Sequence, residues 1–308
     1  MAYITSAVRA VKFNGEAPDS PVLTLYRRWS AHHDRQRATT AREKGSWESL
    51  SSKGKWLSWS QVEEVVRQQR TAYEDATTSL DRAREGVRYA VLLFYSVLPP
   101  GRSLEYRTLT YKYVPRRHLY PSVPTPSDES ENVLFLADDG SDVGGLYLGS
   151  FKNKRSTGAQ KLRLDDKFDY FLSFIRRYVN KLRPRLLQQQ TSAAARQHSF
   201  LFVVSLVSAS RTDPTAVRVH ALWPPPPTSP QDTAGQSFED DVNSARWNQF
   251  IVTTTRRRAN GIGIGPSLLR SSFVTHMMDS KGRRFTNRMK EQFAAAMRHS
   301  VAYVSSNN

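Results

Sequence analysis

The strongest constraint on the fold is an apolar segment at residues 87–98, VRYAVLLFYSVL, which is followed directly by Pro99-Pro100-Gly101. A segment of this length and apolarity predicts a helix that is buried in a larger core. Proline has no backbone N–H and its ring clashes with the preceding turn, so the helix must end before Pro99. The turn then allows a new helix to begin, and we expect that helix at Gly101–Leu109.

The residues before the buried segment predict a second, more polar helix. Ser58 or Ser60 can cap this helix, and Glu63 lies three residues after Ser60, as in a capping box. A further helix is expected at Pro21–Arg37. The side chains at helical spacing behind the cap are Val62, Val65, Val66 and Gln69.

Charge and composition indicate the class of partner. Among 308 residues, Lys and Arg number 45 and Asp and Glu 28, which gives a formal net charge of +17. Such a balance favours a polyanionic partner, with nucleic acid as the leading candidate. No run of about 18 apolar residues or signal peptide occurs, so we expect a soluble, intracellular protein. The absence of cysteine excludes disulfides, thiolate zinc sites and cysteine nucleophiles.

The chain beyond residue 100 mixes strand and helix patterns. Two short runs, 131–140 and 144–154, are separated by turn residues and predict antiparallel strands, with Val133 and Phe135 alternating with polar or smaller neighbours. Leu201–Val207 fits a helix or a strand, and 223–236 a proline-rich loop. The remaining helices are expected at Asp166–Leu187 and Phe238–Thr253.

These patterns predict an α-rich protein of two domains. We place the boundary near residue 85, so that residues 1–85 form a small, basic, helical module. Residues 86–308 then form a mixed α/β domain with a small antiparallel sheet.

Two charged side chains lie on apolar-periodic segments that close the chain. Arg270 follows the helix entry Gly265-Pro266, and His299 stands near the end of a second short helix marked by Phe293 and Met297. We expect the two helices to present Arg270 and His299 to one cleft.

Four sequence pieces occur in this order: GRSLEYRTL at 101–109 (the first motif), FKNK at 151–154 (the lysine segment), PSLLRSSFVTHMM at 266–278 (the second motif) and MRHS at 297–300 (the third motif). This order resembles the catalytic domain of tyrosine recombinases, the phage-integrase family, including its mobile-element branches. The resemblance covers roughly residues 88–308, and residues 1–85 match the helical DNA-clamping domain of that family in general type.

The resemblance implies a catalytic set. Arg102, followed three residues later by a glutamate, and Arg270 would bind the phosphate, since guanidinium groups stay charged and can bind two oxygens at once. Lys152, or alternatively Lys154, would protonate the leaving 5′ oxygen, and His299 would hold a phosphate oxygen or carry a proton. A tyrosine of the family forms a covalent 3′-phosphotyrosine without a metal or cofactor.

The chain departs from the family pattern in two places. Ser267 stands where the second motif has histidine, and a hydroxyl cannot replace an imidazole in acid–base catalysis. The family tyrosine follows the third-motif histidine by about nine residues, which leads to Asn308. Tyr303, four residues after His299, would lie on the same face of a continuing helix. Either Tyr303 is the nucleophile, or a tyrosine follows Asn308 in the full gene, or the protein is a repurposed copy.

Other motifs carry weaker interpretations. The triplet Arg256-Arg257-Arg258 is either a solvated face or a contact with the DNA backbone, for which Lys154 and Arg155 are further candidates. The sequence lacks histidine or carboxylate groups with metal-ligand spacing, so His198, His220 and His276 are interpreted as surface or packing residues.

The function favoured by these residues is site-specific recombination of duplex DNA, by a homotetramer as the resemblance implies. The alternatives are a catalytically inactive DNA-binding protein derived from such a recombinase, and an unrelated basic chromatin or RNA-binding protein. Recombination places the protein in the nucleus of a eukaryotic host, and otherwise in the cytoplasm with the nucleoid.

Overall fold

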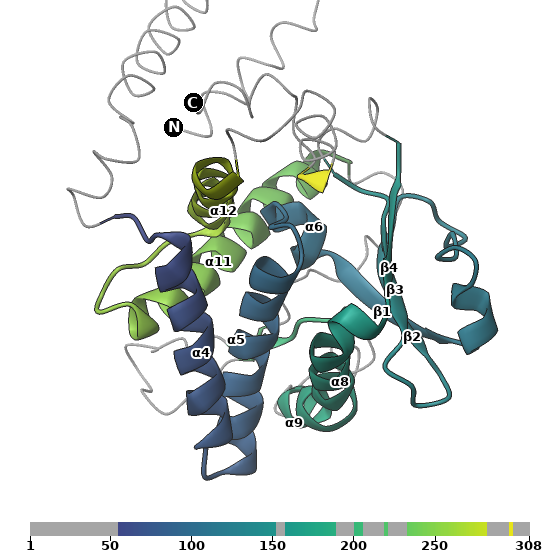
Figure 1. Cartoon of the computed structure of the whole chain (residues 1–308), viewed down its shortest axis with the longest axis horizontal. Helices are drawn as coiled ribbons and strands as arrows, with labels where there is room; N and C mark the ends of the chain where they lie inside the picture. Colours follow the sequence, from purple (N-terminus) through teal and green to yellow (C-terminus); the bar gives the residue numbers. More distant parts are fainter. Residues whose placement is uncertain are drawn as a thin grey trace, which may run out of the picture. The chain divides into compact units, whose positions relative to one another are not determined.

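The computed structural model describes residues 55–151, 158–188, 200–205, 219–220, 233–281 and 296–297. The chain divides into two compact units, Met1–Lys55 and Trp56–Asn308. All helices and strands described below belong to the second unit, which combines many helices with a small sheet (Figure 1). The predicted α-rich class is therefore confirmed. The helix predicted at Pro21–Arg37 lies outside the described residues.

Helix α4 (Trp59–Glu74) begins with a capping box at Ser58. The Ser58 hydroxyl accepts a hydrogen bond from the Gln61 backbone N–H at 3.4 Å, and the Gln61 side chain accepts one from the Ser58 N–H at 2.8 Å. Ser58 is thus the cap, and Gln61 takes the place expected for Glu63. Three of the four predicted stripe residues, Val62, Val65 and Gln69, are buried, and Val66 is partly buried.

Helix α5 (Ser79–Val97) is the buried helix that the sequence predicts, and it ends before Pro99. It lies antiparallel to α4 (Figure 1). The predicted domain boundary near residue 85 falls inside α5, and α4 and α5 belong to the same compact unit. Helix α6 (Ser103–Arg107) follows the proline turn, within the predicted range.

The sheet contains four strands in the order β1 (Leu109–Val114), β2 (Asn132–Ala137), β3 (Gly144–Leu148) and β4 (Gln160–Leu164). The β2–β3 and β3–β4 pairs are antiparallel, but β1 is parallel to β2. The antiparallel strands predicted at 131–140 and 144–154 are therefore confirmed as the pair β2–β3, but the sheet as a whole is mixed rather than antiparallel. The reason is the long connection between β1 and β2, which includes the 3₁₀ turn η1 (Arg116–Leu119) and can return the chain to the same end of the sheet.

Strand β2 is buried at all six positions, so the predicted alternation around Val133 and Phe135 is also wrong. Leu134 and Leu136 face the main core, whereas Val133 and Phe135 belong to a second apolar cluster. The β1–β2 connection supplies Leu119 and Val123 to this cluster, among others. The connection thereby covers the face of β2 that would otherwise be solvated.

The predicted helix at Asp166–Leu187 is confirmed, with two irregular turns. It consists of the 3₁₀ turn η2 (Asp166–Phe168), α8 (Asp169–Arg177), the π-helical turn η3 (Tyr178–Leu182) and α9 (Arg183–Leu187). The π turn precedes Pro184, whose missing N–H breaks the regular α-helical bonding. Leu172 of α8 packs next to Gly144, the first residue of β3.

The second half of the unit is built on α11 (Thr233–Arg258) and α12 (Pro266–Lys281). Helix α11 contains the predicted segment and extends it at both ends, so residues 233–236 are helical rather than loop. Residues 223–232 of the predicted loop lie outside the described residues. In the segment 201–207, β5 (Val204–Ser205) pairs with β6 (Val219–His220), which makes those two residues a strand.

The turn between α11 and α12 is held by backbone hydrogen bonds, from Gly261 to Arg256 and from Ile262 to Ala259, and by the hydroxyl of Thr255. Asn260 and Gly261 end α11 with positive φ angles of 48° and 87°. The Thr255 hydroxyl accepts from the Ile264 N–H at 2.9 Å, and its one proton is within reach of the Ile251 and Ile264 carbonyls, at 3.0 and 3.1 Å. These bonds set where α12 starts, and thus where Arg270 lies along it.

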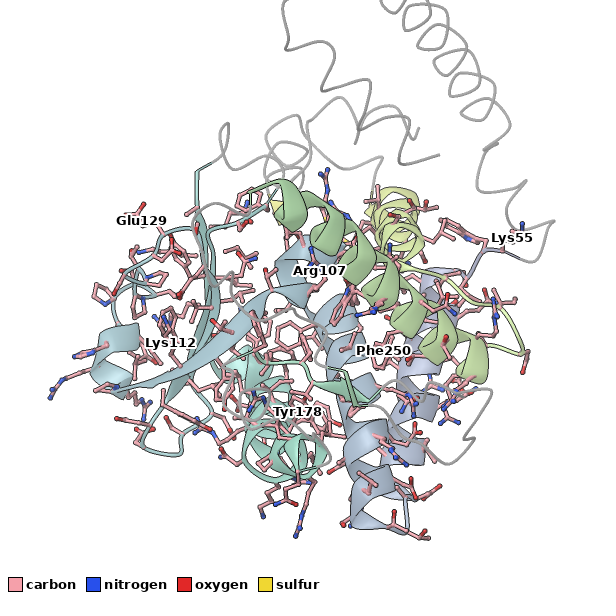
Figure 2. All side chains as sticks on the ribbon, turned by 180° about the vertical axis from the view of Figure 1, so that it is seen from behind. Lys55, Arg107, Lys112, Glu129, Tyr178 and Phe250 are labelled. Atoms are coloured by element: carbon pink, nitrogen blue, oxygen red, sulfur yellow. The ribbon has the colours of Figure 1, made fainter. Side chains whose placement is uncertain are left out.

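Aromatic side chains fill the interior between these elements. Tyr178 and Phe250 lie in the packed interior (Figure 2), and Trp247 is fully buried. Among the described residues, every helix is too short or too polar to cross a lipid bilayer.

The tight turn after β3 leads to a first prediction. A Cβ at Gly149 would overlap the Glu129 carbonyl oxygen and lie 2.6 Å from that of Glu131. Because both obstacles are backbone atoms, Gly149→Ala should lower the free energy of unfolding by about 3 kcal/mol. Gly140→Ala is the control, since its φ of 84° is unfavourable but nothing lies within 4 Å of the added carbon, and a loss of about 1 kcal/mol is expected. Urea unfolding of both variants tests the difference, and equal losses would contradict it.

Candidate functional site

Arg102 is the N-cap residue of α6 and is half-buried. Its backbone N–H donates to the Glu105 carboxylate at 2.6 Å, and Glu105 is fully buried. A Cβ at Gly101 would lie 2.7 Å from the same carboxylate, so the site requires glycine there. The spacing of Gly101, Arg102 and Glu105 therefore has a structural reason, because it closes the N-terminus of α6.

Arg270 lies on α12 and is 4 % exposed. Its guanidinium donates from Nη2 to the Met297 carbonyl oxygen at 2.7 Å. Met297 is the first residue of the third motif, which continues with Arg298-His299-Ser300 outside the described residues. The structure thus brings Arg270 into contact with the segment that carries the predicted histidine, although 27 residues separate the bonded groups.

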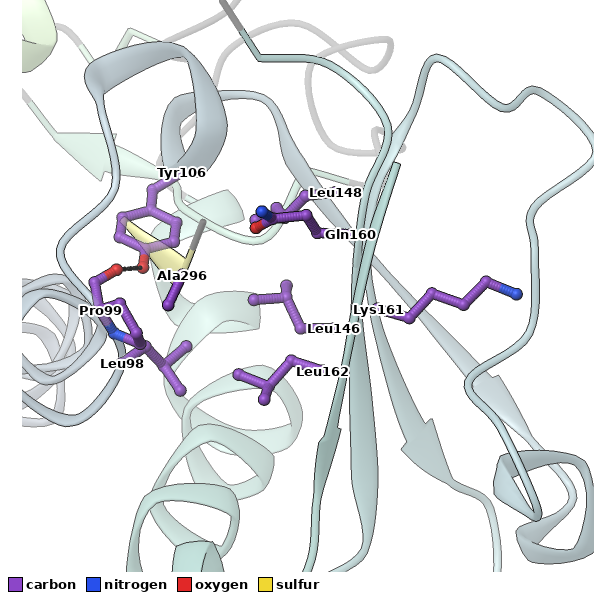
Figure 3. Close-up of a pocket in the computed structure, with 9 residues that line it drawn as sticks. All are labelled: Leu98, Pro99, Tyr106, Leu146, Leu148, Gln160, Lys161, Leu162 and Ala296. Atoms are coloured by element: carbon purple, nitrogen blue, oxygen red, sulfur yellow. Dashed lines mark hydrogen bonds between the residues drawn. The ribbon is translucent and has the colours of Figure 1, made fainter. Parts of the chain in front are cut away.

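An apolar cavity of about 330 Å³ lies between α6, the sheet and Ala296. Tyr106 borders it from α6 and donates a hydrogen bond to the Pro99 carbonyl at 2.9 Å (Figure 3). Leu146 and Leu162 border it from the sheet, whereas Lys161 points away from it (Figure 3). Most of the side chains that line the cavity are apolar, so the cavity suits apolar contacts rather than the binding of a phosphate. The cavity also shows that Tyr106 of the first motif lies near Ala296, the residue that precedes the third motif.

A buried asparagine connects α6 to the turn after β3. Asn132 is 1 % exposed, and its Nδ2 donates to the carbonyls of Glu105 at 3.3 Å and Ser150 at 3.1 Å and to the Thr108 hydroxyl at 2.9 Å. Its Oδ1 accepts from the N–H groups of Gly149 and Ser150, at 3.0 and 2.9 Å. Sequence reasoning missed Asn132, since a single asparagine at the start of a strand carries no distinctive pattern.

The remaining catalytic candidates are not covered by the structure. Lys152, Lys154, Arg155, His299 and Tyr303 all lie outside the described residues. In the sequence, Lys152 and Lys154 fall between β3 and β4, which are paired antiparallel strands. Their catalytic roles stay predictions.

The triplet Arg256–Arg258 forms the last turn of α11. Arg256 and Arg257 are exposed. Arg258 instead donates to the Gln69 side chain at 3.1 Å and to the Glu85 carboxylate at 3.2 Å. The sequence pattern does not distinguish the three arginines, but their surroundings in the structure differ.

Two further titratable side chains, those of Tyr95 and His276, have surroundings typical of the core and of the surface. Tyr95 is fully buried and accepts a hydrogen bond from the Trp247 indole at 3.2 Å. Burial raises the pKa of the Tyr95 hydroxyl, which makes it a poor nucleophile. His276 is exposed and its ring lies 6.5 Å from that of Trp59, as expected for a surface histidine. In the described part of the chain, no three histidine or carboxylate side chains group together as metal ligands.

Comparisons of the chain with protein-family models, with curated proteins and with solved structures found no match. The resemblance to tyrosine recombinases therefore rests on the four sequence pieces and stays a prediction.

The buried amide of Asn132 leads to a second prediction. In Asn132→Asp, the carboxylate could still accept from Gly149 and Ser150, but it could not donate to three oxygens that now face a buried negative charge. We expect a loss of about 3 kcal/mol or more in the free energy of unfolding, measured by urea denaturation. Asn180→Asp is the control, because the exposed Asn180 uses its amide oxygen as acceptor for the Tyr113 hydroxyl at 2.6 Å. An equally small loss in both variants would refute the role of Asn132.

Proposed function

We propose that this protein is a DNA-binding, site-specific recombinase that cuts and rejoins DNA through a 3′-phosphotyrosine. The observation that carries the proposal is the hydrogen bond from Arg270 to Met297, because it joins the second and third motifs. Ala296 and Tyr106 border one cavity, which adds helix α6, whose N-cap is Arg102, to the same neighbourhood. Elements of three sequence pieces that are distant in the chain are thus neighbours in the fold.

The chemistry of transesterification explains why these residue types would act together. The tyrosine oxygen attacks the phosphorus, a P–O bond forms to tyrosine, and the bond to the 5′ oxygen breaks. Charge develops on the non-bridging oxygens, where the guanidinium groups of Arg102 and Arg270 would stabilise it. Lys152 would give its proton to the leaving 5′ oxygen. One phosphodiester bond replaces another, so the reverse attack restores the DNA.

Arg270 has a second role in this scheme. Its bond to Met297 couples the position of α12 to the start of the segment that carries His299. A movement of either element would then displace both phosphate-binding candidates together. In this proposal Arg270 binds the phosphate and also, through its bond to Met297, holds the segment that carries His299.

An inactive, recombinase-derived DNA-binding protein is the second candidate. The observation that favours it is Ser267, which replaces the expected histidine and is exposed on the first turn of α12. Its carbonyl accepts a hydrogen bond from the Ser271 hydroxyl at 3.1 Å, an ordinary helix contact. A protein of this kind would keep the DNA affinity and lack the covalent step. Either candidate implies duplex DNA as partner and a location with the host's DNA, and the active form implies a tetramer.

A suicide substrate tests the proposal. The substrate is a nicked duplex that loses a short fragment after cleavage, so that the covalent protein–DNA complex accumulates. We expect the wild-type chain to form this complex, Arg102→Ala to form it about 10²–10³-fold more slowly, and Tyr303→Phe to form none. Arg67→Ala, which removes an exposed charge on α4, should react at the wild-type rate.

The outcomes separate the candidates. Duplex binding without any covalent complex in the wild type would favour the inactive derivative. A covalent complex that persists in Tyr303→Phe would place the nucleophile elsewhere. An undiminished rate in Arg102→Ala would remove Arg102 from the site. Failure to bind duplex DNA at all would refute both candidates and favour an unrelated basic protein.

A further inference from the structure

The helical run from α8 to α9 carries a row of positive charge on its exposed face. Residues 170–188 contain basic residues but no Asp or Glu. Three of these basic residues, Arg177, Lys181 and Arg185, are exposed and follow one another at four-residue intervals. They belong to one continuous run, because α8, η3 and α9 follow each other without a gap. We call these three side chains the basic row.

The other two basic residues of the run have structural partners. Arg176 and Arg183 donate to backbone carbonyls, and Arg176 also lies 3.9 Å from the Asp142 carboxylate. The basic row differs from them. Among the described residues, no carboxylate is ion-paired with any of its three members, and Arg185 donates to the neutral Gln188 side chain at 3.4 Å. The charge of the row is therefore directed to solvent.

Exposed arginines on α4 have different neighbours. Arg67 is ion-paired with Glu64, and Arg70 with Glu74 at 2.7 Å, each within one helical turn. In the basic row the neighbour one turn away is another cation, and like charges at this spacing weaken a helix. A cation near a helix C-terminus is favourable, but this applies to Arg185 and not to the other two. The row therefore works against the stability of its own helix.

The π turn η3 keeps the basic row in line. A four-residue step in an α-helix overshoots a full turn, because one turn takes about 3.6 residues. A π turn takes more residues, so the same step falls short of a full turn. The two steps of the row include both kinds of turn, with Lys181 inside η3. The drift partly cancels, and the three side chains stay on one face of the run.

The basic row lies away from the candidate phosphate site. Leu182 of η3 packs against Gly86 of α5. About 16 Å of helix separates Gly86 from Val97, after which the chain continues to Arg102 and α6. Helix α9 accordingly lies beside the half of α5 that is distant from α6 (Figure 1). A ligand of the row would thus be held outside the cleavage site.

The surroundings of the basic row favour a nucleic-acid backbone over a membrane or a protein. The apolar side of the run is buried in the core, so no apolar face is left to enter a lipid layer. The exposed residues between and beside the cations lack the large apolar side chains found at the centre of protein interfaces. These exposed residues are Ser173, Asn180, Pro184 and Gln188.

The length of the basic row fits a regular polyanion. With a rise of about 1.5 Å per residue, the row is at most about 12 Å long. One strand of duplex DNA presents a phosphate about every 3.4 Å along its axis, so about three or four phosphates can lie beside the row.

We propose that Arg177, Lys181 and Arg185 bind the phosphate backbone of duplex DNA outside the segment that is cut. The inference rests on the proposed function for its choice of duplex DNA as the polyanion. Arginine can donate two parallel bonds to one phosphate, and lysine binds as a point charge. Because phosphates carry no sequence information, the row adds affinity without specificity.

The test is the salt dependence of binding to a non-specific duplex, followed by fluorescence anisotropy. The double variant Arg177→Ala/Arg185→Ala should make the slope of log K against log salt less negative by about 2. Arg67→Ala/Arg70→Ala is the matched control, because it removes the same charge from two exposed arginines of one helix, and it should keep the wild-type slope. Arg177→Lys/Arg185→Lys keeps the charge and should keep the slope. Equal slopes in the two alanine variants would overturn the proposal.

A second measurement uses the wild-type protein and does not depend on the folding of a variant. Duplex DNA should protect Arg177 and Arg185 from an arginine-specific reagent, as read by mass spectrometry, and should leave Arg67 unprotected. Modification of Arg177 and Arg185 at the same rate with and without DNA would contradict the assignment.

The two proposals fail in different ways. If the basic row alone is wrong, the covalent complex still forms on the suicide substrate, and the two alanine variants share one slope. If the recombinase proposal alone is wrong, the slopes differ as expected but no covalent complex forms. Weaker binding of Arg177→Ala/Arg185→Ala to vesicles of anionic phospholipid, with an unchanged duplex slope, would overturn the assignment to DNA. Absence of any wild-type binding to the duplex would overturn both.

Discussion

The five hydrogen bonds of the Asn132 amide are the interaction on which the candidate site most depends. They join three backbone segments, namely the end of α6, the start of β2 and the turn after β3. Apolar packing also brings these segments together, but it is non-directional and would tolerate a shift along the sheet. A buried amide does not tolerate such a shift, because each partner left without a bond costs free energy. Asn132 therefore sets how the helix that begins at Arg102 stands against the strand pair β3–β4.

Two arginines of this basic chain serve the protein itself. Arg176 donates to the Ala137 carbonyl at 2.9 Å and Arg183 to that of Phe200 at 2.9 Å. In each case a guanidinium on a helix satisfies a carbonyl at the end of a strand or in a loop. The formal charge counts these arginines together with exposed ones such as Arg257. Charge alone thus indicates the class of partner, whereas hydrogen bonding separates the arginines that hold the fold from those that can reach a partner.

Sequence patterns predicted the elements whose signals are local. Ser58, the prolines after α5 and the glycines between β2 and β3 act within a few residues, so these elements are confirmed near their expected limits. Sequence patterns did not predict strand β1, and they predicted an alternation of buried and exposed residues in β2 that the structure does not show. The two errors have a common reason. Both depend on the connection between those strands, which allows parallel pairing and covers the outer face of β2 with a second apolar cluster. The residue pattern of a strand carries no information about which loop, from elsewhere in the chain, packs against its outer face.

The sequence by itself determined the start of α4, the end of α5, the hairpin, the basic character of the chain and the order of the four motif pieces. Only the tertiary structure decided which residues of those pieces meet. Arg270 and Met297 are 27 residues apart, and Arg258 and Glu85 are 173 apart, yet each pair is hydrogen-bonded. Capping and turn formation depend on neighbours in the chain, so they can be predicted from short patterns. Long-range pairs instead depend on how the packed helices exclude water and bring a buried polar group within reach of partners that are distant in the sequence.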